Sequence, residues 1–155
     1  MSVIGSIERR QCRQTGYTLL EVLVAAVLLT TGLIGLASMQ VNGTRLNNSA
    51  YLRSQATILA YDIVDRMRAN IPAARAGSYD LALADATPTA TTSVPDIDLG
   101  QWRTAVAYNL PAGSSSVARV AGISPDDPSQ FTVTVQWNDG RDPADVVNFT
   151  ITTNL

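Results

Sequence analysis

The residues of this chain with the clearest chemical meaning lie near its N-terminus, in the run Gly16-Tyr17-Thr18-Leu19-Leu20-Glu21. Glu21 stands at the head of an apolar run, Val22 to Thr44, that contains no charged residue. An isolated acid in a helix costs about 2.5–3.5 kcal/mol at the centre of a bilayer and less near the interface. Glu21 therefore either marks the aqueous edge of an ordinary anchor or has a partner of opposite charge.

Cleavage of the chain after Gly16 would create such a partner. Tyr17 would then become a new N-terminus with a positive amine, and Glu21 would be the fifth residue of the mature chain. An amine and a carboxylate about 4 Å apart attract by about 4 kcal/mol at an effective dielectric near 20, and desolvation removes part of this gain. The amine of one helix can meet Glu21 of a neighbouring helix, and such a pair would set the axial register of parallel helices.

The apolar run that follows Glu21 has the length of a membrane span. Its 23 residues would form a helix of roughly 34 Å, and a bilayer core is about 30 Å thick. The run exceeds the hydrophobic region of a signal peptide, which has about 7–15 residues. Three arginines before it, Arg9, Arg10 and Arg13, favour a cytoplasmic N-terminus. We expect residues 1–16 to be a leader and residues 17–44 to be the transmembrane half of a helix.

Beyond Thr44 the chain becomes amphipathic. Leu52, Leu59, Ile63 and Met67 recur at helical spacing, which predicts one buried face. The pattern indicates that the helix continues over residues 45–71, that Pro72 ends it, and that these four residues pack against a sheet.

The remaining residues are expected to form a connecting loop over 72–100 and an antiparallel sheet of about four strands over 101–155. Alternating apolar residues mark the later strands most clearly. One helical turn is expected at 81–84, and the aromatic residues are expected in the core, Tyr108 included. The expected fold class is α+β, with strands over 102–109, 117–123, 131–137 and 147–151.

Composition argues against catalysis and against a resident cofactor. The chain has no histidine, and its only cysteine, Cys12, lies in the expected leader, so Ser–His and Cys–His dyads and thiolate zinc sites are excluded from the mature chain. Without residues 1–16, eight arginines face twelve acids for a net charge of −4, which does not favour nucleic-acid binding. Asp96 and Asp98 lack the dense oxygen spacing of a cation site and are expected to be solvated loop acids. We expect no enzyme activity, metal or cofactor.

The glycine-ended leader, the aromatic-Thr-Leu-Leu-Glu start and the long apolar helix resemble type IV pilins and, more distantly, type II secretion pseudopilins. The resemblance implies that a prepilin peptidase cleaves between Gly16 and Tyr17 and methylates the Tyr17 amine, and that Glu21 serves assembly. Three features depart from the family: Tyr17 replaces the usual Phe, no helix-kinking proline precedes Pro72, and the mature chain has no cysteine to form the disulfide that closes a C-terminal loop in many major pilins.

The run from Asp65 to Asn70, just before Pro72, resembles the helix end of PilV-type minor pilins. This resemblance implies a single-pass inner-membrane protein with a periplasmic domain, which helps to initiate pilus assembly and enters the pilus or its tip complex. The implied partners are other minor pilins, the major pilin, the assembly platform, a tip adhesin and the lipid bilayer. Adhesion and twitching motility are the implied processes. Two alternatives remain open: a minor pseudopilin of a type II secretion system, and a membrane-tethered binding module that uses its sheet and the 72–100 loop.

Overall fold

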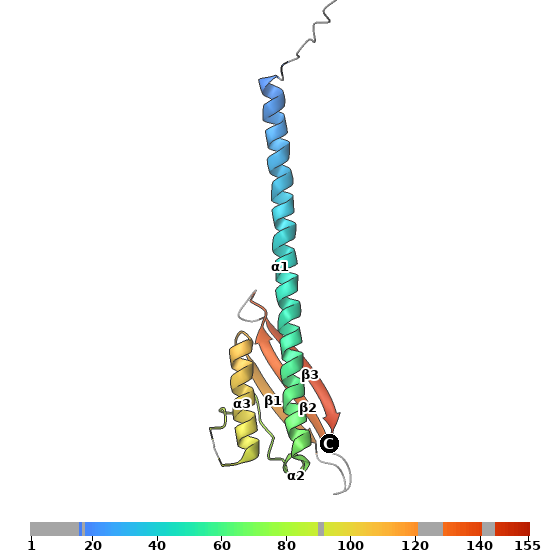
Figure 1. The fold of residues 1–155 in the computed structure, drawn as a ribbon, viewed down its shortest axis with the longest axis vertical. Coiled ribbons are helices and arrows are strands. Elements are labelled where there is room, and N and C mark those ends of the chain that lie inside the picture. Colours follow the sequence, from blue (N-terminus) through green and yellow to red (C-terminus); the bar gives the residue numbers. More distant parts are fainter. Residues whose placement is uncertain (1–15, 17, 90–91, 121–128, 141–144) are drawn as a thin grey trace, which may run out of the picture. The chain divides into compact units, whose positions relative to one another are not determined.

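The computed structural model describes residue 16 and residues 18–89, 92–120, 129–140 and 145–155. The chain divides into two compact units, Met1–Thr44 and Arg45–Leu155, and one helix, α1, contributes residues to both. Figure 1 shows the elements, which are α1 (Leu19–Ala69), α2 (Ile71–Arg75), α3 (Val94–Asn109), β1 (Ser114–Val120), β2 (Gln130–Asn138) and β3 (Val146–Asn154).

The part of α1 in the first unit is apolar and fully exposed. Every residue from Leu19 to Thr44 is exposed in the single chain. The hydroxyls of Thr30 and Thr31 both donate to the carbonyl of Val27 at 2.9 Å. Because these hydroxyls are bonded to the backbone of their own helix, they present no unsatisfied donor to a hydrocarbon environment.

The second unit contains an antiparallel sheet in the order β1-β2-β3. Val133 at its centre pairs with Val117 of β1 and with Ile151 of β3. Along β2 the side chains alternate in burial, as expected for a sheet with one covered face. The predicted α+β class, with a long helix packed on an antiparallel sheet, is confirmed. The sheet has three strands among the described residues, whereas four were expected.

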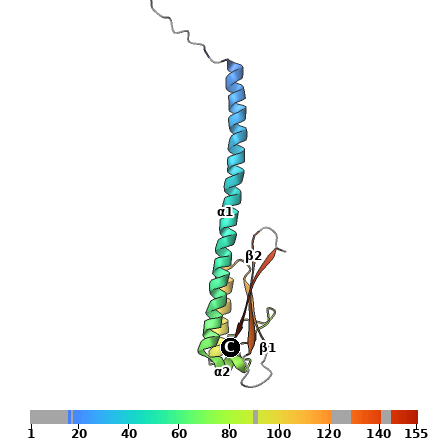
Figure 2. The same cartoon turned by 90° about the vertical axis from the view of Figure 1, so that its right-hand side faces the viewer.

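The domain half of α1 and helix α3 cover the same face of the sheet (Figure 2). Ala56 and Ala60 of α1 are completely buried, so small side chains bring the helix close to its neighbours. The core combines α1, α3, the sheet and the segment between α2 and α3. Its largest fully buried side chains include Trp102, Trp137, Tyr79, Phe131, Ile63 and Met67.

The strand expected over 102–109 is wrong, because these residues belong to helix α3. Pro95 lies in the first turn of α3, where its missing N–H costs nothing. Leu99, Trp102 and Val106 are buried and lie at i, i+3 and i+7, which places them on one helical face. The helix therefore begins inside the segment that was expected to be a loop.

Two further expectations near the connecting segment differ from the structure. Leu81, expected in a helical turn, forms an isolated antiparallel bridge with Val117 of β1. Helix α1 ends at Ala69, two residues earlier than expected, and Pro72 lies in the first turn of α2. Leu81 pairs with β1 because the segment after α2 runs beside that strand, whereas α1 ends because Asn70 has a non-helical backbone conformation.

Two side chains of α3 bind it to its neighbours through backbone carbonyls. The indole Nε1 of Trp102 donates to the carbonyl of Leu59 in α1 at 2.8 Å. The guanidinium of Arg103, which is only 7 % exposed, donates to carbonyls of the connecting segment and of β1. Its four acceptors are the carbonyls of Ala82, Leu83, Asp85 and Ser115.

Replacing Arg103 with Met should lower the free energy of unfolding by about 2–3 kcal/mol, because it leaves partly buried carbonyls without donors. Unfolding of the full chain in detergent micelles, followed through the two buried tryptophans, measures the change. The matched control is Arg53→Met on the exposed surface of α1, which should change the value by less than about 0.5 kcal/mol. Equal unfolding midpoints for the two variants would contradict the role of Arg103.

Candidate functional site

The start of α1 forms the candidate processing and assembly site. Gly16 is exposed, and a Cβ placed on it would meet no atom within 4 Å. Tyr17 lies outside the described residues. Thr18 caps the helix, because its Oγ1 accepts a hydrogen bond from the N–H of Glu21 at 3.3 Å. Gly16 thus precedes the capping residue Thr18 by two positions in the sequence.

Glu21 has a local role that the sequence analysis missed. Thr18 and Glu21 have the spacing of a capping box, and Glu21 lies in the first turn of α1. An acid here interacts favourably with the helix dipole by about 0.3–1 kcal/mol. Its side chain is exposed, and within the described part of the chain nothing donates to its carboxylate. The helix dipole thus explains an acid at this position within one chain. The exposed carboxylate remains available to bind another chain.

The apolar run behind Glu21 makes α1 the one helix, among the residues described, that is long and apolar enough to cross a membrane. None of the residues in this run is buried. The run is suited to a membrane by its length and composition, since an exposed apolar surface of this kind is unfavourable in water.

The four packing residues expected on α1 lie in the core of the second unit. Leu52 and Leu59 are 5 % and 8 % exposed, and Ile63 and Met67 are completely buried. These residues contribute to the core cluster that includes the buried face of β2.

The opposite face of α1 in the second unit carries exposed apolar side chains. Tyr51, Ile58 and Tyr61 are 58 %, 59 % and 51 % exposed, and they lie at i, i+7 and i+10, so they share one helical face. We call these three residues the outer stripe. The outer stripe was not predicted from the sequence, because only the buried face of this helix was expected. The same spacing rule applied to the remaining apolar residues reveals the stripe.

A polar cluster joins the end of α1 to α3. Arg66 donates to Asp62 at 3.1 Å, to Asp98 at 3.2 Å and to Gln101 at 3.0 Å. The hydroxyl of Tyr79 donates to the other oxygen of Asp98 at 2.7 Å. Asp98 is therefore not the solvated loop acid that was expected. We call this set of five side chains the Arg66 cluster, and it explains the presence of Arg66 at the helix end through the fold alone.

Tyr79 is the member of the cluster whose titration is most altered. Its side chain is completely buried. Burial, with the hydrogen bond and the charge of Asp98 as further causes, raises the pKa of Tyr79 to about 12. The phenol therefore stays protonated and keeps donating to Asp98 at any physiological pH.

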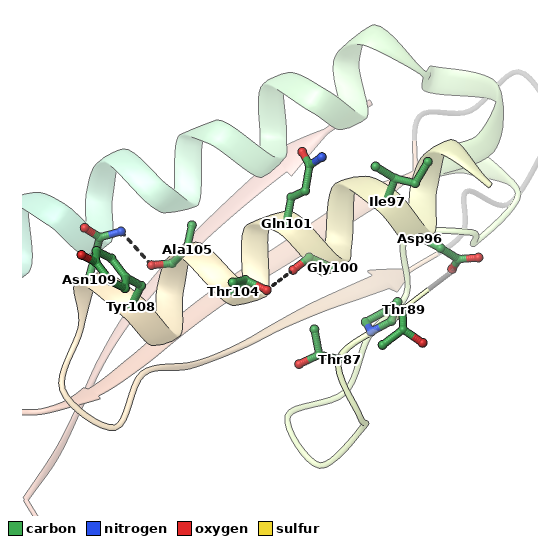
Figure 3. Close-up of a pocket in the computed structure, with 11 residues that line it drawn as sticks. Thr87, Thr89, Asp96, Ile97, Gly100, Gln101, Thr104, Ala105, Tyr108 and Asn109 are labelled. Carbon is green, nitrogen blue, oxygen red and sulfur yellow. Dashed lines mark hydrogen bonds between the residues drawn. The ribbon is translucent and has the colours of Figure 1, made fainter. Parts of the chain in front are cut away.

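A surface groove of about 820 Å³ lies between the segment 87–89 and α3 (Figure 3). A Cβ on Gly100 would lie 2.5 Å from the carbonyl oxygen of Pro88, so glycine permits this close approach. Tyr108, expected in the core, lies on the rim and is 89 % exposed.

Three polar side chains of the groove are already engaged within the domain. Thr104 donates to the carbonyl of Gly100 at 2.7 Å, and Asn109 donates to the carbonyl of Ala105 at 2.8 Å (Figure 3). Gln101 accepts from Arg66. The groove therefore offers a surface of α3 rather than a convergent set of free polar groups.

Comparison with known proteins finds a known sequence motif at the start of α1. Residues 11–37 match the family model described as the prokaryotic N-terminal methylation motif. The chain carries a type IV prepilin-like leader. The matched residues include Gly16, Tyr17 and Glu21 and the first part of the apolar run. No match was found among the curated proteins or among the solved structures.

The titration of Tyr79 predicts how stability depends on alkaline pH. The folded pKa of about 12 lies above the ordinary tyrosine pKa of 10.0, so the folded state holds the phenolic proton more tightly. This contribution to the free energy of unfolding is fully present below about pH 10 and is lost as the pH rises towards 12. A rise of the pKa from 10.0 to about 12 corresponds to about 2–3 kcal/mol. Unfolding of the full chain in micelles between pH 9 and 12 should show this loss, and Tyr79→Phe should remove most of it. Identical pH profiles for the two proteins would contradict the assignment.

Proposed function

We propose that this protein is a minor pilin, a membrane-inserted subunit that helps to initiate type IV pilus assembly and enters the pilus or its tip complex. The methylation motif over residues 11–37, at the head of an entirely exposed apolar helix segment, is the observation that carries the proposal. An apolar helix of this length needs lipid before assembly and other helices after it.

The leader, residues 1–16, is removed by a prepilin peptidase, and the new amine of Tyr17 is methylated. The three leader arginines keep the N-terminus in the cytoplasm, so the domain after Arg45 lies in the periplasm before assembly. Glu21 then pairs with the Tyr17 amine of a neighbouring subunit, and this ion pair fixes the axial offset between their helices.

The outer stripe supports a role inside an assembly. Tyr51, Ile58 and Tyr61 place exposed apolar side chains on the side of the domain half of α1 that is turned away from its own core. Helices of a monomeric soluble domain normally present polar residues on that side. The stripe is suited to contact with helices of the major pilin and of other minor pilins.

The run from Asp65 to Asn70 supports the PilV type among the minor pilins. Met67 is completely buried and Arg66 is the centre of the Arg66 cluster, so this part of the run is fitted to the fold of the domain. The assembly platform and a tip adhesin complete the proposed set of partners.

Replacing Gly16 with Ser should block removal of the leader, because a side chain at this position enters the peptidase site where glycine presents only hydrogen. The full chain and the variant are expressed with a prepilin peptidase and compared by intact mass. The wild type should lose residues 1–16 and gain a methyl group, whereas the variant should keep its leader. A variant of mature mass would show that the cleavage site is wrong.

Replacing Glu21 with Gln should leave leader removal intact but reduce the amount of this chain in sheared pili by about tenfold or more, since one ion pair per interface is lost. Thr18→Ala is the matched control, because it removes the helix cap and keeps the carboxylate. The control should be processed and incorporated nearly as the wild type is. Equal losses in both variants would assign Glu21 to helix-end stability instead of intersubunit pairing.

A further inference from the structure

The sheet of the second unit has two edges, and among the described residues only the β1 edge is bonded to other segments of the chain. Val117 of β1 exchanges two backbone hydrogen bonds of 2.9 Å with Leu81. The carbonyl of Ser115, also in β1, accepts from the buried guanidinium of Arg103 at 3.1 Å. Residues of the same domain thereby occupy three outward-facing backbone groups of β1, namely the N–H and C=O of Val117 and the C=O of Ser115.

The hydrogen-bond pattern shows which groups face the other edge. Ser129 and Leu155 donate to each other's carbonyls at 2.9 and 3.0 Å, and this pair extends the β2–β3 register by one step. In an antiparallel ladder such bonded pairs alternate with non-bonded pairs. The next bonded residues of β3 are therefore 153, 151, 149 and 147. Asn148, Thr150 and Thr152 consequently turn their N–H and C=O groups away from β2.

This edge has none of the usual protection against strand pairing. Among the described residues no strand pairs with β3 on its outer side, and β3 forms one margin of the sheet in Figure 1. Natural edge strands are shortened, bulged, or protected by charges or proline. Strand β3 has nine residues, Val146–Asn154, of which none is charged and none is proline.

We propose that the free edge of β3 is a docking site for an extended strand of another pilus subunit, which adds to the sheet as a fourth strand. The edge offers backbone donors and acceptors at every second residue, a repeat of about 6.8 Å that only another extended backbone matches along its length. The inference rests on the proposed function for the source of the strand, and on the sheet for its geometry.

A second copy of this chain fits the edge less well than a different subunit does. Antiparallel pairing of β3 with β3 requires a twofold axis normal to the sheet, which turns the second domain end for end. Residue 45, where the chain enters each domain, would then lie at opposite ends of the pair, although both anchors belong in one membrane. Parallel pairing of β3 with β3 forms the weaker ladder, and the β1 edge of a second copy is already occupied by Leu81.

Hydrogen exchange measures occupancy of the edge without any mutation. The tagged full-length chain is purified alone in detergent micelles and, separately, from piliated cells together with the pilus subunits bound to it. The amides of Asn148, Thr150 and Thr152 should exchange rapidly in the chain alone and at least about tenfold more slowly in the complex. Unchanged exchange in the complex overturns the proposal.

Proline at position 150 tests whether the edge carries the interaction. Because the N–H of Thr150 faces the free edge, Thr150→Pro removes no backbone hydrogen bond to β2, yet it deprives an incoming strand of a donor. The recovered amount of bound subunits should fall by about tenfold. Thr150→Val is the matched control, since it loses only the 3.3 Å contact between the hydroxyls of Thr150 and Thr134, and it should bind as the wild type does.

The remaining outcomes are also decisive. Protection that is already present in the chain alone and grows with its concentration assigns the edge to a second copy and overturns the proposed occupant. If Thr150→Pro loses the fluorescence of the buried tryptophans, the exchange measurement on the wild type decides. A pilus complex with a freely exchanging edge refutes the docking strand alone, whereas a wild-type chain that binds no pilus subunit refutes the proposed function as well.

Discussion

The contact between α1 and the sheet is the interaction on which the domain depends. A three-stranded sheet with one apolar face needs a cover, and the face of α1 from Leu52 to Met67 provides it. The hydrogen bond from Trp102 to the carbonyl of Leu59 then fixes α3 beside α1. With both helices in place, Arg66 of α1 can reach Asp98 of α3, and the segment that carries Tyr79 is held against them.

The same helix leaves apolar surface that its own chain does not cover. In the first unit this surface is the whole run from Val22 to Thr44, and in the second it is the outer stripe. Burial of apolar surface is the main favourable term in both folding and association. Such a surface is unfavourable in water, and in the proposed function it is buried first by the membrane and then by helices of other subunits. The methylation motif at the head of the helix is consistent with that order of events.

The two edges of the sheet show how the domain controls association through its backbone. A buried guanidinium is costly unless its donors are satisfied, and Arg103 satisfies them with carbonyls, one of which belongs to the β1 edge. Together with Leu81 it occupies backbone groups at the middle of that edge. Strand β3 has no equivalent residue among those described, and it is therefore the edge at which we propose that the sheet is extended. The asymmetry comes from the path of the segment between α2 and α3.

Local patterns in the sequence were sufficient for the helix start, the membrane-length run, the buried face of α1 and the alternating strands, because each depends on residues close together along the chain. Residues 102–109 were misassigned because apolar and aromatic residues suit both strands and helices, and only packing of Trp102 against α1 decides between them. The Arg66 cluster, the outer position of Tyr108 and the open edge of β3 involve residues distant in sequence. Only the tertiary structure decides these features, because they depend on which segments lie side by side.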